Sequence, residues 1–181
     1  MALEALIEHL TKNALRTDGP FTLRSGSYSD WYLDARQTTF DGTGARLVGE
    51  AVLSVLHEDV TGIGGMTMGA DPIAIATAMT AAANGRDLKA FSIRKEVKDH
   101  GVGGRVVGPI DTDMPLAVLE DTTTTGSAAV EAARYLLDSE FEILQAIALV
   151  DRSGEKAREN FVALGIDYVA LIRPDDLGVS A

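Results

Sequence analysis

The sequence contains no cysteine, which excludes disulfide bonds, thiolate catalysis and cysteine-ligated zinc sites. It is also short of basic residues: 16 Lys and Arg stand against 27 Asp and Glu, a formal net charge of −11. Binding to nucleic acid or anionic membranes needs a basic surface, so this balance argues against both. No apolar run is long enough to span a membrane, and residues 1–15 read as an amphipathic helix rather than a signal peptide. We therefore expect a cytoplasmic protein without a nucleic-acid or membrane partner.

Hydrophobic residues are plentiful, at 46% of 181 positions, and strand-like and helix-like segments alternate along most of the chain. Strands are expected at 60–66, 88–93, 115–121, 142–151 and 167–172, and helices at 1–15, 44–58, 70–85, 126–139 and 154–165. In the helix at 70–85, Asp71 is the expected N-cap and Pro72 the first helical residue. Residues 20–36 read as two short strands around a turn. The alternation predicts one α/β domain over residues 1–181, with a mostly parallel sheet flanked by helices.

The segment PLAVLEDTTTTGSAA, residues 115–129, places two acids and a threonine-rich turn between a strand and a helix. Backbone N–H groups, hydroxyls and the helix N-terminus together form a phosphate cradle. A ribose 5-phosphate would fill the cradle and offer its hydroxyls to Glu120 and Asp121. The alternative is an ordinary strand end with a solvated acidic pair. A Walker A loop is excluded because no Gly-Lys-Ser/Thr triplet occurs, and residues 62–71 lack the G-x-G-x-x-G spacing of dinucleotide-binding proteins.

Residues 94–105 hold four basic and two acidic side chains, a local charge of +2 in an acidic chain. The segment includes His100 and ends in closely spaced glycines. It is either a binding loop for a small polyanion or a solvated surface hairpin. His9 and His57 lie within helical patterns and are interpreted as structural or solvent-exposed.

Four segments carry a resemblance to the type I phosphoribosyltransferases, and in particular to the orotate phosphoribosyltransferases among them. AVLEDTTTTGSA resembles the family's phosphoribosyl-diphosphate signature, and RKEVKDHGVGG resembles its catalytic loop. FTLRSGSYSDWYLDAR and LVDRSGE resemble the segments that meet orotate. The resemblance covers residues 21–155 and implies a type I phosphoribosyltransferase fold with a small N-terminal hood, residues 1–40. It also implies that orotate and 5-phosphoribosyl 1-diphosphate give orotidine 5′-monophosphate and pyrophosphate, with Mg²⁺ held mainly by the diphosphate substrate and by no direct protein ligand.

The resemblance assigns roles to individual residues of this chain. Lys98 and Asp121 are expected to be catalytic. For Lys98 the reason is that cations near the departing pyrophosphate stabilise the negative charge that develops there. The residues expected to bind 5-phosphoribosyl 1-diphosphate are Arg94, Lys95, Lys98, His100, Glu120, Asp121, Thr122, Thr123, Thr124, Thr125, Gly126, Ser127 and Ala128. The residues expected to bind orotate are Arg24, Tyr32, Leu33, Thr124 and Arg152. Trp31 is expected to be core or rim.

Two positions depart from the family pattern. Arg24 stands where well-known members have lysine, and Met68 stands where many members have a lysine after a tyrosine, so one diphosphate contact is expected to be lost. Two alternative functions remain open: transfer to another nucleobase, which would not need Arg152, and a non-catalytic phosphoribosyl-diphosphate sensor that binds nucleic acid. The family further implies a symmetric homodimer with shared active sites.

Overall fold

A computed structural model of the chain describes residues 2–22, 26, 28–96 and 104–180. Its centre is a six-stranded sheet with the strand order β10-β9-β8-β5-β6-β7. Neighbouring strands are parallel, except that the short β7 runs antiparallel to β6. The predicted α/β class with a mostly parallel sheet is therefore confirmed. The strands are β5 (Gly62–Met66), β6 (Lys89–Ile93), β7 (Val106–Val107), β8 (Leu116–Thr123), β9 (Ile143–Asp151) and β10 (Asp167–Ile172).

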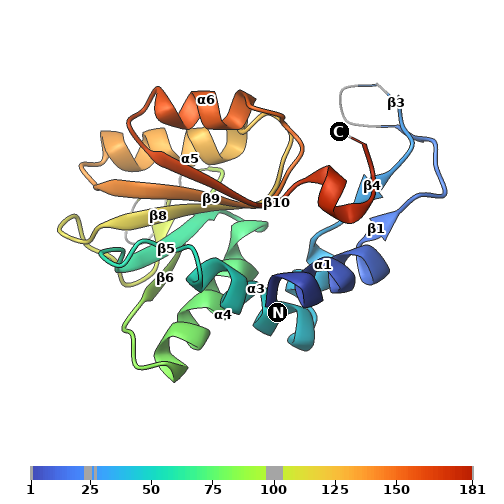
Figure 1. Cartoon of the computed structure of the whole chain (residues 1–181). Helices are drawn as coiled ribbons and strands as arrows, with labels where there is room; N and C mark the ends of the chain where they lie inside the picture. Colours follow the sequence, from blue (N-terminus) through green and yellow to red (C-terminus); the bar gives the residue numbers. More distant parts are fainter. Residues whose placement is uncertain (1, 23–25, 27, 97–103, 181) are drawn as a thin grey trace.

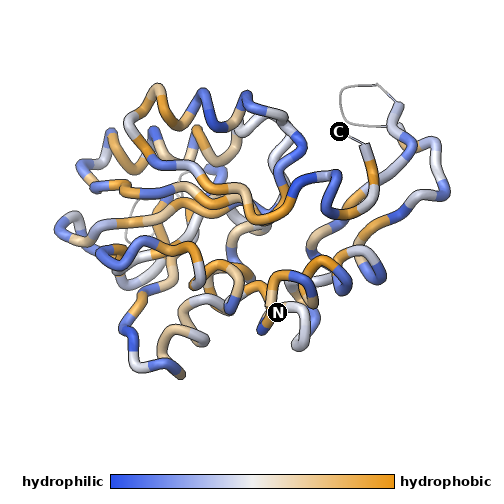
Figure 2. The backbone as a smooth tube through the Cα atoms, in the orientation of Figure 1, coloured by the Kyte–Doolittle hydropathy of each residue, from blue (hydrophilic) through white to orange (hydrophobic). Residues whose placement is uncertain are grey.

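Helices cover both faces of this sheet. In Figure 1, α5 (Ser127–Asp138) and α6 (Lys156–Val162) lie above it, and α3 (Gly42–Leu53) and α4 (Ala70–Ala83) lie below it. Successive strand residues point to opposite faces, so Leu119 belongs to the core cluster shared with α3 and α4, whereas Leu116 and Val118 belong to the cluster shared with α5 and α6. Both faces are thus apolar, which explains the nearly continuous hydrophobic colouring of the central strands in Figure 2.

The order of the strands reverses between β5 and β8. From β5 the chain first adds β6 on one side and then returns to add β8, β9 and β10 on the other. Open α/β sheets bind ligands beyond the carboxyl ends of the strands at such a reversal. The fold therefore directs attention to the turns that follow β5, β8 and β9.

The N-terminal residues form a small hood beside those turns. It consists of α1 (Ala2–Asn13), α2 (Arg36–Thr39) and two antiparallel pairs, β1 (Leu15–Arg16) with β4 (Tyr32–Leu33) and β2 (Phe21–Thr22) with β3 (Tyr28–Ser29). Leu6 and Leu10 of α1 are fully buried in the same core cluster as α3. After β10, the short helix η1 (Pro174–Leu177) carries the C-terminal segment back to the hood (Figure 1). Both ends of the chain therefore build the region beside the strand ends.

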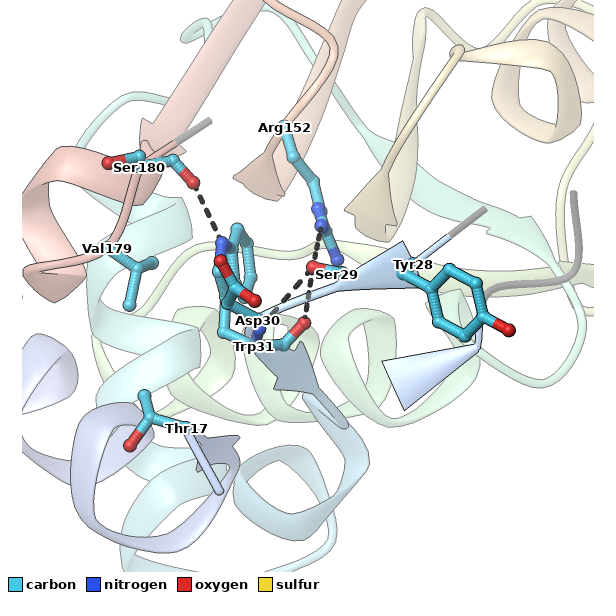
Figure 3. A pocket seen from close by; sticks show the side chains of 8 residues that line it. All are labelled: Thr17, Tyr28, Ser29, Asp30, Trp31, Arg152, Val179 and Ser180. Carbon is cyan, nitrogen blue, oxygen red and sulfur yellow. Dashed lines mark hydrogen bonds between the residues drawn. The ribbon is translucent and has the colours of Figure 1, made fainter. Parts of the chain in front are cut away.

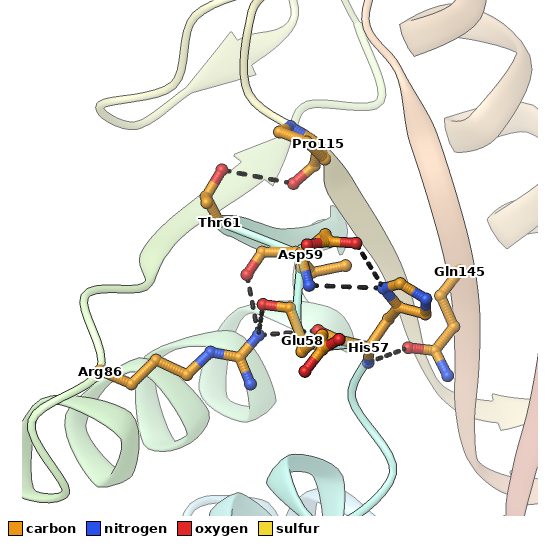
Figure 4. A network of polar contacts seen from close by, with 8 residues as sticks. His57, Glu58, Asp59, Thr61, Arg86, Pro115 and Gln145 are labelled. Carbon is orange, nitrogen blue, oxygen red and sulfur yellow. Dashed lines mark hydrogen bonds and ion pairs between the residues drawn. The ribbon is translucent and has the colours of Figure 1, made fainter.

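A polar network closes the opposite end of the sheet (Figure 4). The Nη2 of Arg86 donates to backbone carbonyls of the α3–β5 connection, including those of His57 (2.8 Å) and Val60 (2.9 Å). Gln145, buried in β9, accepts from the His57 backbone N–H (3.0 Å) and donates to the Val55 carbonyl (2.9 Å). These contacts satisfy backbone groups that would otherwise lose their hydrogen bonds on burial. The imidazole of His57 is 48% exposed and accepts from the Asp59 backbone N–H at 3.4 Å, which agrees with its interpretation as structural or solvent-exposed.

His9 also has a structural role. Its Nδ1 lies 3.1 Å from Thr38 Oγ1, and its Nε2 lies 3.1 Å from Asp41 Oδ1. Asp41 is the N-cap of α3 and accepts from the backbone N–H groups of Thr43 and Gly44. The histidine thus joins α1 to the start of α3. No helix in the described ranges is long and apolar enough to cross a membrane.

The start of α4 differs from the prediction. The helix begins at Ala70 with Gly69 as its N-cap residue, so the assignment of Asp71 as N-cap and Pro72 as first helical residue is wrong. The Oδ2 of Asp71 instead accepts from the Thr67 hydroxyl at 2.6 Å. Gly69 already has helical backbone angles, and the helix therefore starts two residues earlier than the sequence pattern indicates.

Other boundaries differ by a few residues. The strand β8 continues to Thr123, two residues past its expected end, because it pairs with β9 up to Asp151. The helix α3 ends at Leu53, before the expected residue 58. Residues 20–36 hold three two-residue strands rather than two, and the two-residue β7 was not anticipated. Elements this short are specified by their pairing partners rather than by a local pattern.

Candidate active site

The hood and the turns after β8 and β9 border a cavity of about 690 Å³. The strand β4 and the start of α2 supply one side of it, and the turn after β8 supplies the other. Seven of the residues assigned from the sequence meet here, although they come from three distant parts of the chain. The lining residues are Thr22, Tyr32, Leu33, Asp34, Ala35, Arg36, Asp121, Thr122, Thr124, Thr125 and Arg152.

The turn between β8 and α5 has the geometry of an anion cradle. Gly126 precedes the helix with φ +76°, a left-handed conformation that favours glycine. A Cβ at this position would also lie 3.2 Å from the Ala157 Cβ, a tight contact that would push Ala157 away, so both the backbone conformation and the space disfavour a larger residue. The hydroxyl of Thr125 donates to Ser127 Oγ at 3.0 Å. The first N–H groups of α5, which lack partners within the helix, therefore follow directly on a turn whose Thr124 and Thr125 reach the cavity.

The two acids of β8 occupy different surroundings. Asp121 lines the cavity and accepts from the Thr122 backbone N–H at 2.7 Å. A Cβ on Gly69 would lie 2.7 Å from Asp121 Oδ1, so a side chain at this point of the β5–α4 turn would displace the carboxylate. The Oε2 of Glu120 is buried and has no hydrogen-bond partner within the described residues. Burial raises the pKa of both carboxyls, and the neighbouring Asp121 helps to raise the pKa of Glu120 to about 7.

The Glu120→Gln variant is expected to change how stability depends on pH. The folded protein holds a proton on Glu120 up to about pH 7, whereas the unfolded chain releases it near 4.5, so the free energy of unfolding falls as pH rises between these values. At pH 8 the variant should be more stable than the wild type by on the order of 2–3 kcal/mol, and the difference should vanish near pH 4. Urea unfolding across this pH range measures it. Exposed Glu8→Gln is the control, and a difference that stays constant with pH would contradict the prediction.

A second charged pair lines the cavity and was missed from the sequence. Arg36 Nε donates to Asp34 Oδ1 at 2.7 Å, which holds the pKa of Asp34 below its usual range. The positive charge of Arg36 also opposes the rise in the pKa of Asp121. The signal available in the sequence was an acid and a base two residues apart, directly after the assigned residues Tyr32 and Leu33.

Arg152 follows β9 and lies between this cavity and a neighbouring one of about 500 Å³ (Figure 3). Its backbone N–H donates to the Thr123 carbonyl at 2.8 Å, which ties the turn after β9 to β8. The preceding Asp151, 1% exposed, accepts from the Tyr168 hydroxyl at 2.9 Å and so fixes the end of the strand. The guanidinium stacks on Trp31, and burial lowers the pKa of Arg152. Trp31, expected as core or rim, is 6% exposed and belongs to the core.

Among the described residues, the other assigned positions do not line the cavity. Glu120 and Thr123 lie in β8, where Thr123 is 2% exposed, while Gly126, Ser127 and Ala128 form the start of α5. Arg94 and Lys95 follow β6, and the Arg94 backbone N–H donates to the Arg105 carbonyl at 2.8 Å. Three assigned residues, Arg24, Lys98 and His100, lie outside the described residues.

Hard divalent cations prefer several oxygen ligands. Within residues 2–22, 26, 28–96 and 104–180, no group of three or more acidic or histidine side chains converges on a common point. A cation in this cavity would therefore need ligands from a bound substrate or from water in addition to the acids of β8.

Comparison with known proteins gives close relatives over the whole chain. No family model matches it. An orotate phosphoribosyltransferase of Streptomyces avermitilis is 38% identical over 176 residues, which cover 97% of this chain and 96% of that protein. A crystal structure of Mycobacterium tuberculosis orotate phosphoribosyltransferase superposes with a TM-score of 0.88 at 32% identity and covers 99% of this chain and 100% of that one. A structure of the same enzyme in complex with 5-phospho-alpha-D-ribosyl 1-diphosphate has a TM-score of 0.82 at 29% identity, with 99% and 100% covered.

Proposed function

This chain belongs to the orotate phosphoribosyltransferase family, and from that premise we propose how its residues transfer the phosphoribosyl group from 5-phosphoribosyl 1-diphosphate to orotate. The products are orotidine 5′-monophosphate and pyrophosphate, and the reaction is a step of pyrimidine biosynthesis. One observation carries the proposal. A single cavity joins a phosphate cradle and an acid, Asp121, to a cation, Arg152, that can bind a carboxylate.

The half of the cavity next to β8 and α5 suits the sugar phosphate. We assign the 5′-phosphate to the turn of Thr122–Gly126 and the N-terminus of α5, where N–H groups and hydroxyls converge. Asp121 then accepts hydrogen bonds from the 2′- and 3′-hydroxyls of the ribose, and Glu120, which is partly exposed next to it but outside the cavity lining, is proposed as a second partner for these hydroxyls. A neutral Glu120 can also donate such a bond, which suits its raised pKa.

The half of the cavity next to the hood suits orotate. The guanidinium of Arg152 presents parallel N–H donors that match a planar carboxylate. Tyr32 and Leu33 of β4, together with Thr124, line the space beside it and would hold the ring. Arg24 is proposed as a further contact, on the basis of the sequence resemblance alone.

Bond breaking at the anomeric carbon leaves positive charge on the ribose and negative charge on pyrophosphate, while a ring nitrogen of orotate forms the new bond to that carbon and releases its proton to pyrophosphate or to water. We propose that the carboxylate of Asp121 stabilises the ribose cation. Lys98, with Arg94, Lys95 and His100, stabilises the departing pyrophosphate. Groups aimed at charge that exists only in the transition state raise kcat rather than ground-state affinity.

We propose Mg²⁺ as the cofactor, because a diphosphate carries oxygen atoms that this ion prefers, and the acids of β8 supply further oxygens nearby. When bound, Mg²⁺ would neutralise part of the diphosphate charge. We also propose a cytoplasmic site of action, since both substrates are charged anions that do not cross membranes unaided.

The assignment is tested by following the loss of orotate absorbance in the presence of both substrates and Mg²⁺. We expect activity that disappears when either 5-phosphoribosyl 1-diphosphate or Mg²⁺ is left out. Adenine, guanine and uracil are offered as competing acceptors, and a gel-shift assay tests whether the protein binds nucleic acid. Preferred use of another base, or nucleic-acid binding without turnover, would contradict the proposal in favour of one of the two alternatives above.

A homodimer is proposed because the outer side of α4 is apolar and exposed. Ile73 and Ala74 of this helix are buried against the sheet, yet Ile75 is 55% exposed and Met79 is 69% exposed on the other side. Phe40 and Met68 extend the same surface, which borders a groove of about 460 Å³. A helix that is apolar all round is usually buried on all sides. A second copy seated here would lie next to the turn after β5, and so next to the active site.

Shared sites in this dimer are tested by mixing two inactive variants. Lys98→Ala and Asp121→Ala proteins are denatured together, refolded as a mixture and assayed. If the loop of one subunit serves the site of the other, a mixed dimer has one site with both lesions and one with neither, and about a quarter of wild-type activity returns with random pairing. Each variant refolded alone is the control. If each subunit serves its own site, the mixture stays as inactive as its parents.

A further inference from the structure

The guanidinium of Arg152 lies flat against the only tryptophan of the chain, Trp31 (Figure 3). Its Cζ is 3.7 Å from the centroid of the indole ring, whereas the other cation–π contacts in the described residues span 4.9–5.8 Å. The two residues are 121 positions apart in the sequence, so this contact exists only because the hood packs beside the end of β9.

The indole ring is itself held from two directions. Its Nε1 donates to the Ser180 carbonyl of the C-terminal segment at 2.8 Å. The backbone carbonyl of Trp31 accepts from the Ser29 hydroxyl at 2.7 Å, and the Trp31 residue is 6% exposed. Trp31 is therefore a rigid platform, made by the hood and the C-terminal segment together.

Stacking occupies the face of a guanidinium and leaves the N–H donors on its edge free. Arg152 has one described side-chain hydrogen bond, a long one of 3.5 Å from Nη2 to the Ser29 hydroxyl, and forms no ion pair with an acidic side chain of the described residues. A half-buried cation without a counter-ion, beside an open cavity, is suited to an anionic ligand.

We propose that Trp31 is a positioning residue for orotate, which holds the guanidinium of Arg152 with its edge available to the carboxylate of the substrate. This inference rests on the proposed function. An arginine side chain that is already ordered loses less conformational freedom when it binds, so its donors bind the carboxylate more tightly. Trp31 does not touch the reacting atoms and should act only through Arg152.

Steady-state kinetics test this role. Trp31→Leu should raise the KM for orotate by roughly 5- to 30-fold, with the KM for 5-phosphoribosyl 1-diphosphate and kcat within about twofold of wild type. Trp31→Phe keeps an aromatic face without the N–H donor and should restore most of the orotate affinity. In an Arg152→Ala background, Trp31→Leu should add almost nothing, because its partner is gone. Equal rises in both KM values, a Trp31→Phe variant as impaired as Trp31→Leu, or additive effects in the double variant would each overturn the proposal.

Fluorescence of the wild-type protein provides a test that needs no tryptophan variant. Because Trp31 is the only tryptophan, its emission reports on the stack directly. Orotidine 5′-monophosphate should change this emission, uridine 5′-monophosphate, which lacks the carboxylate, should change it far less, and Arg152→Ala should abolish the difference. The same response to both nucleotides would overturn the inference. A wild-type protein that does not convert orotate would instead contradict the proposed function, so the two failures are distinguishable.

Discussion

The Lys98→Ala variant should lose about 10²- to 10⁴-fold in kcat while it still binds both substrates. The reason is electrostatic. The diphosphate is already anionic in the ground state, but pyrophosphate gains further negative charge as the anomeric bond breaks. Removal of the lysine cation therefore destabilises the transition state more than the ground state. Initial rates at saturating substrate measure kcat, and equilibrium binding of 5-phosphoribosyl 1-diphosphate shows whether the ground-state complex survives.

Lys12→Ala is a suitable control, because it removes the same charge from the exposed last turn of α1. Its kcat should equal that of the wild type. An unchanged kcat in Lys98→Ala would remove the catalytic role of this lysine. A loss confined to the KM for 5-phosphoribosyl 1-diphosphate would reduce Lys98 to a ground-state ligand.

The Arg152→Ala variant should raise the KM for orotate by roughly two orders of magnitude, with a far smaller effect on the KM for 5-phosphoribosyl 1-diphosphate. Only orotate carries a ring carboxylate, and its charge would enter the cavity without a partner once the guanidinium is removed. Arg152→Lys should recover only part of the loss, because an ammonium group cannot offer the paired donors. Initial rates over a matrix of both substrate concentrations give the two KM values.

Arg158→Ala on α6 removes a more exposed arginine that pairs with Glu155 at 3.4 Å, and it should leave both KM values unchanged. Equal effects of Arg152→Ala on the two substrates would mean that Arg152 is structural. Its structural contribution would then be the stacking on Trp31, which joins the hood to the sheet.

The order of strands and helices could be predicted from the sequence, because hydrophobic periodicity is a local property that survives in the final packing. The phosphate cradle after β8 could also be predicted, because it too is formed by residues close together in the sequence. An acid, a threonine turn and a helix start are contiguous in residues 120–128, so their relative positions follow from a few backbone angles. The two-residue β7 could not be predicted, since its partner β6 specifies it. The start of α4 could not be predicted either, because it depends on the helical backbone angles of Gly69.

Only the tertiary structure decided how distant residues meet. From the sequence, Arg152 and Tyr32 are assigned to the same ligand only through the family resemblance. No local sequence pattern shows that the two residues lie close together. The packing of the hood on the sheet brings Arg36 into the cavity and puts Trp31 beneath Arg152. The packing of the helices on the sheet buries the carboxyl of Glu120 and leaves the outer side of α4 exposed. Burial, pKa and stacking depend on what surrounds a side chain in space, and no local property of the sequence contains that information.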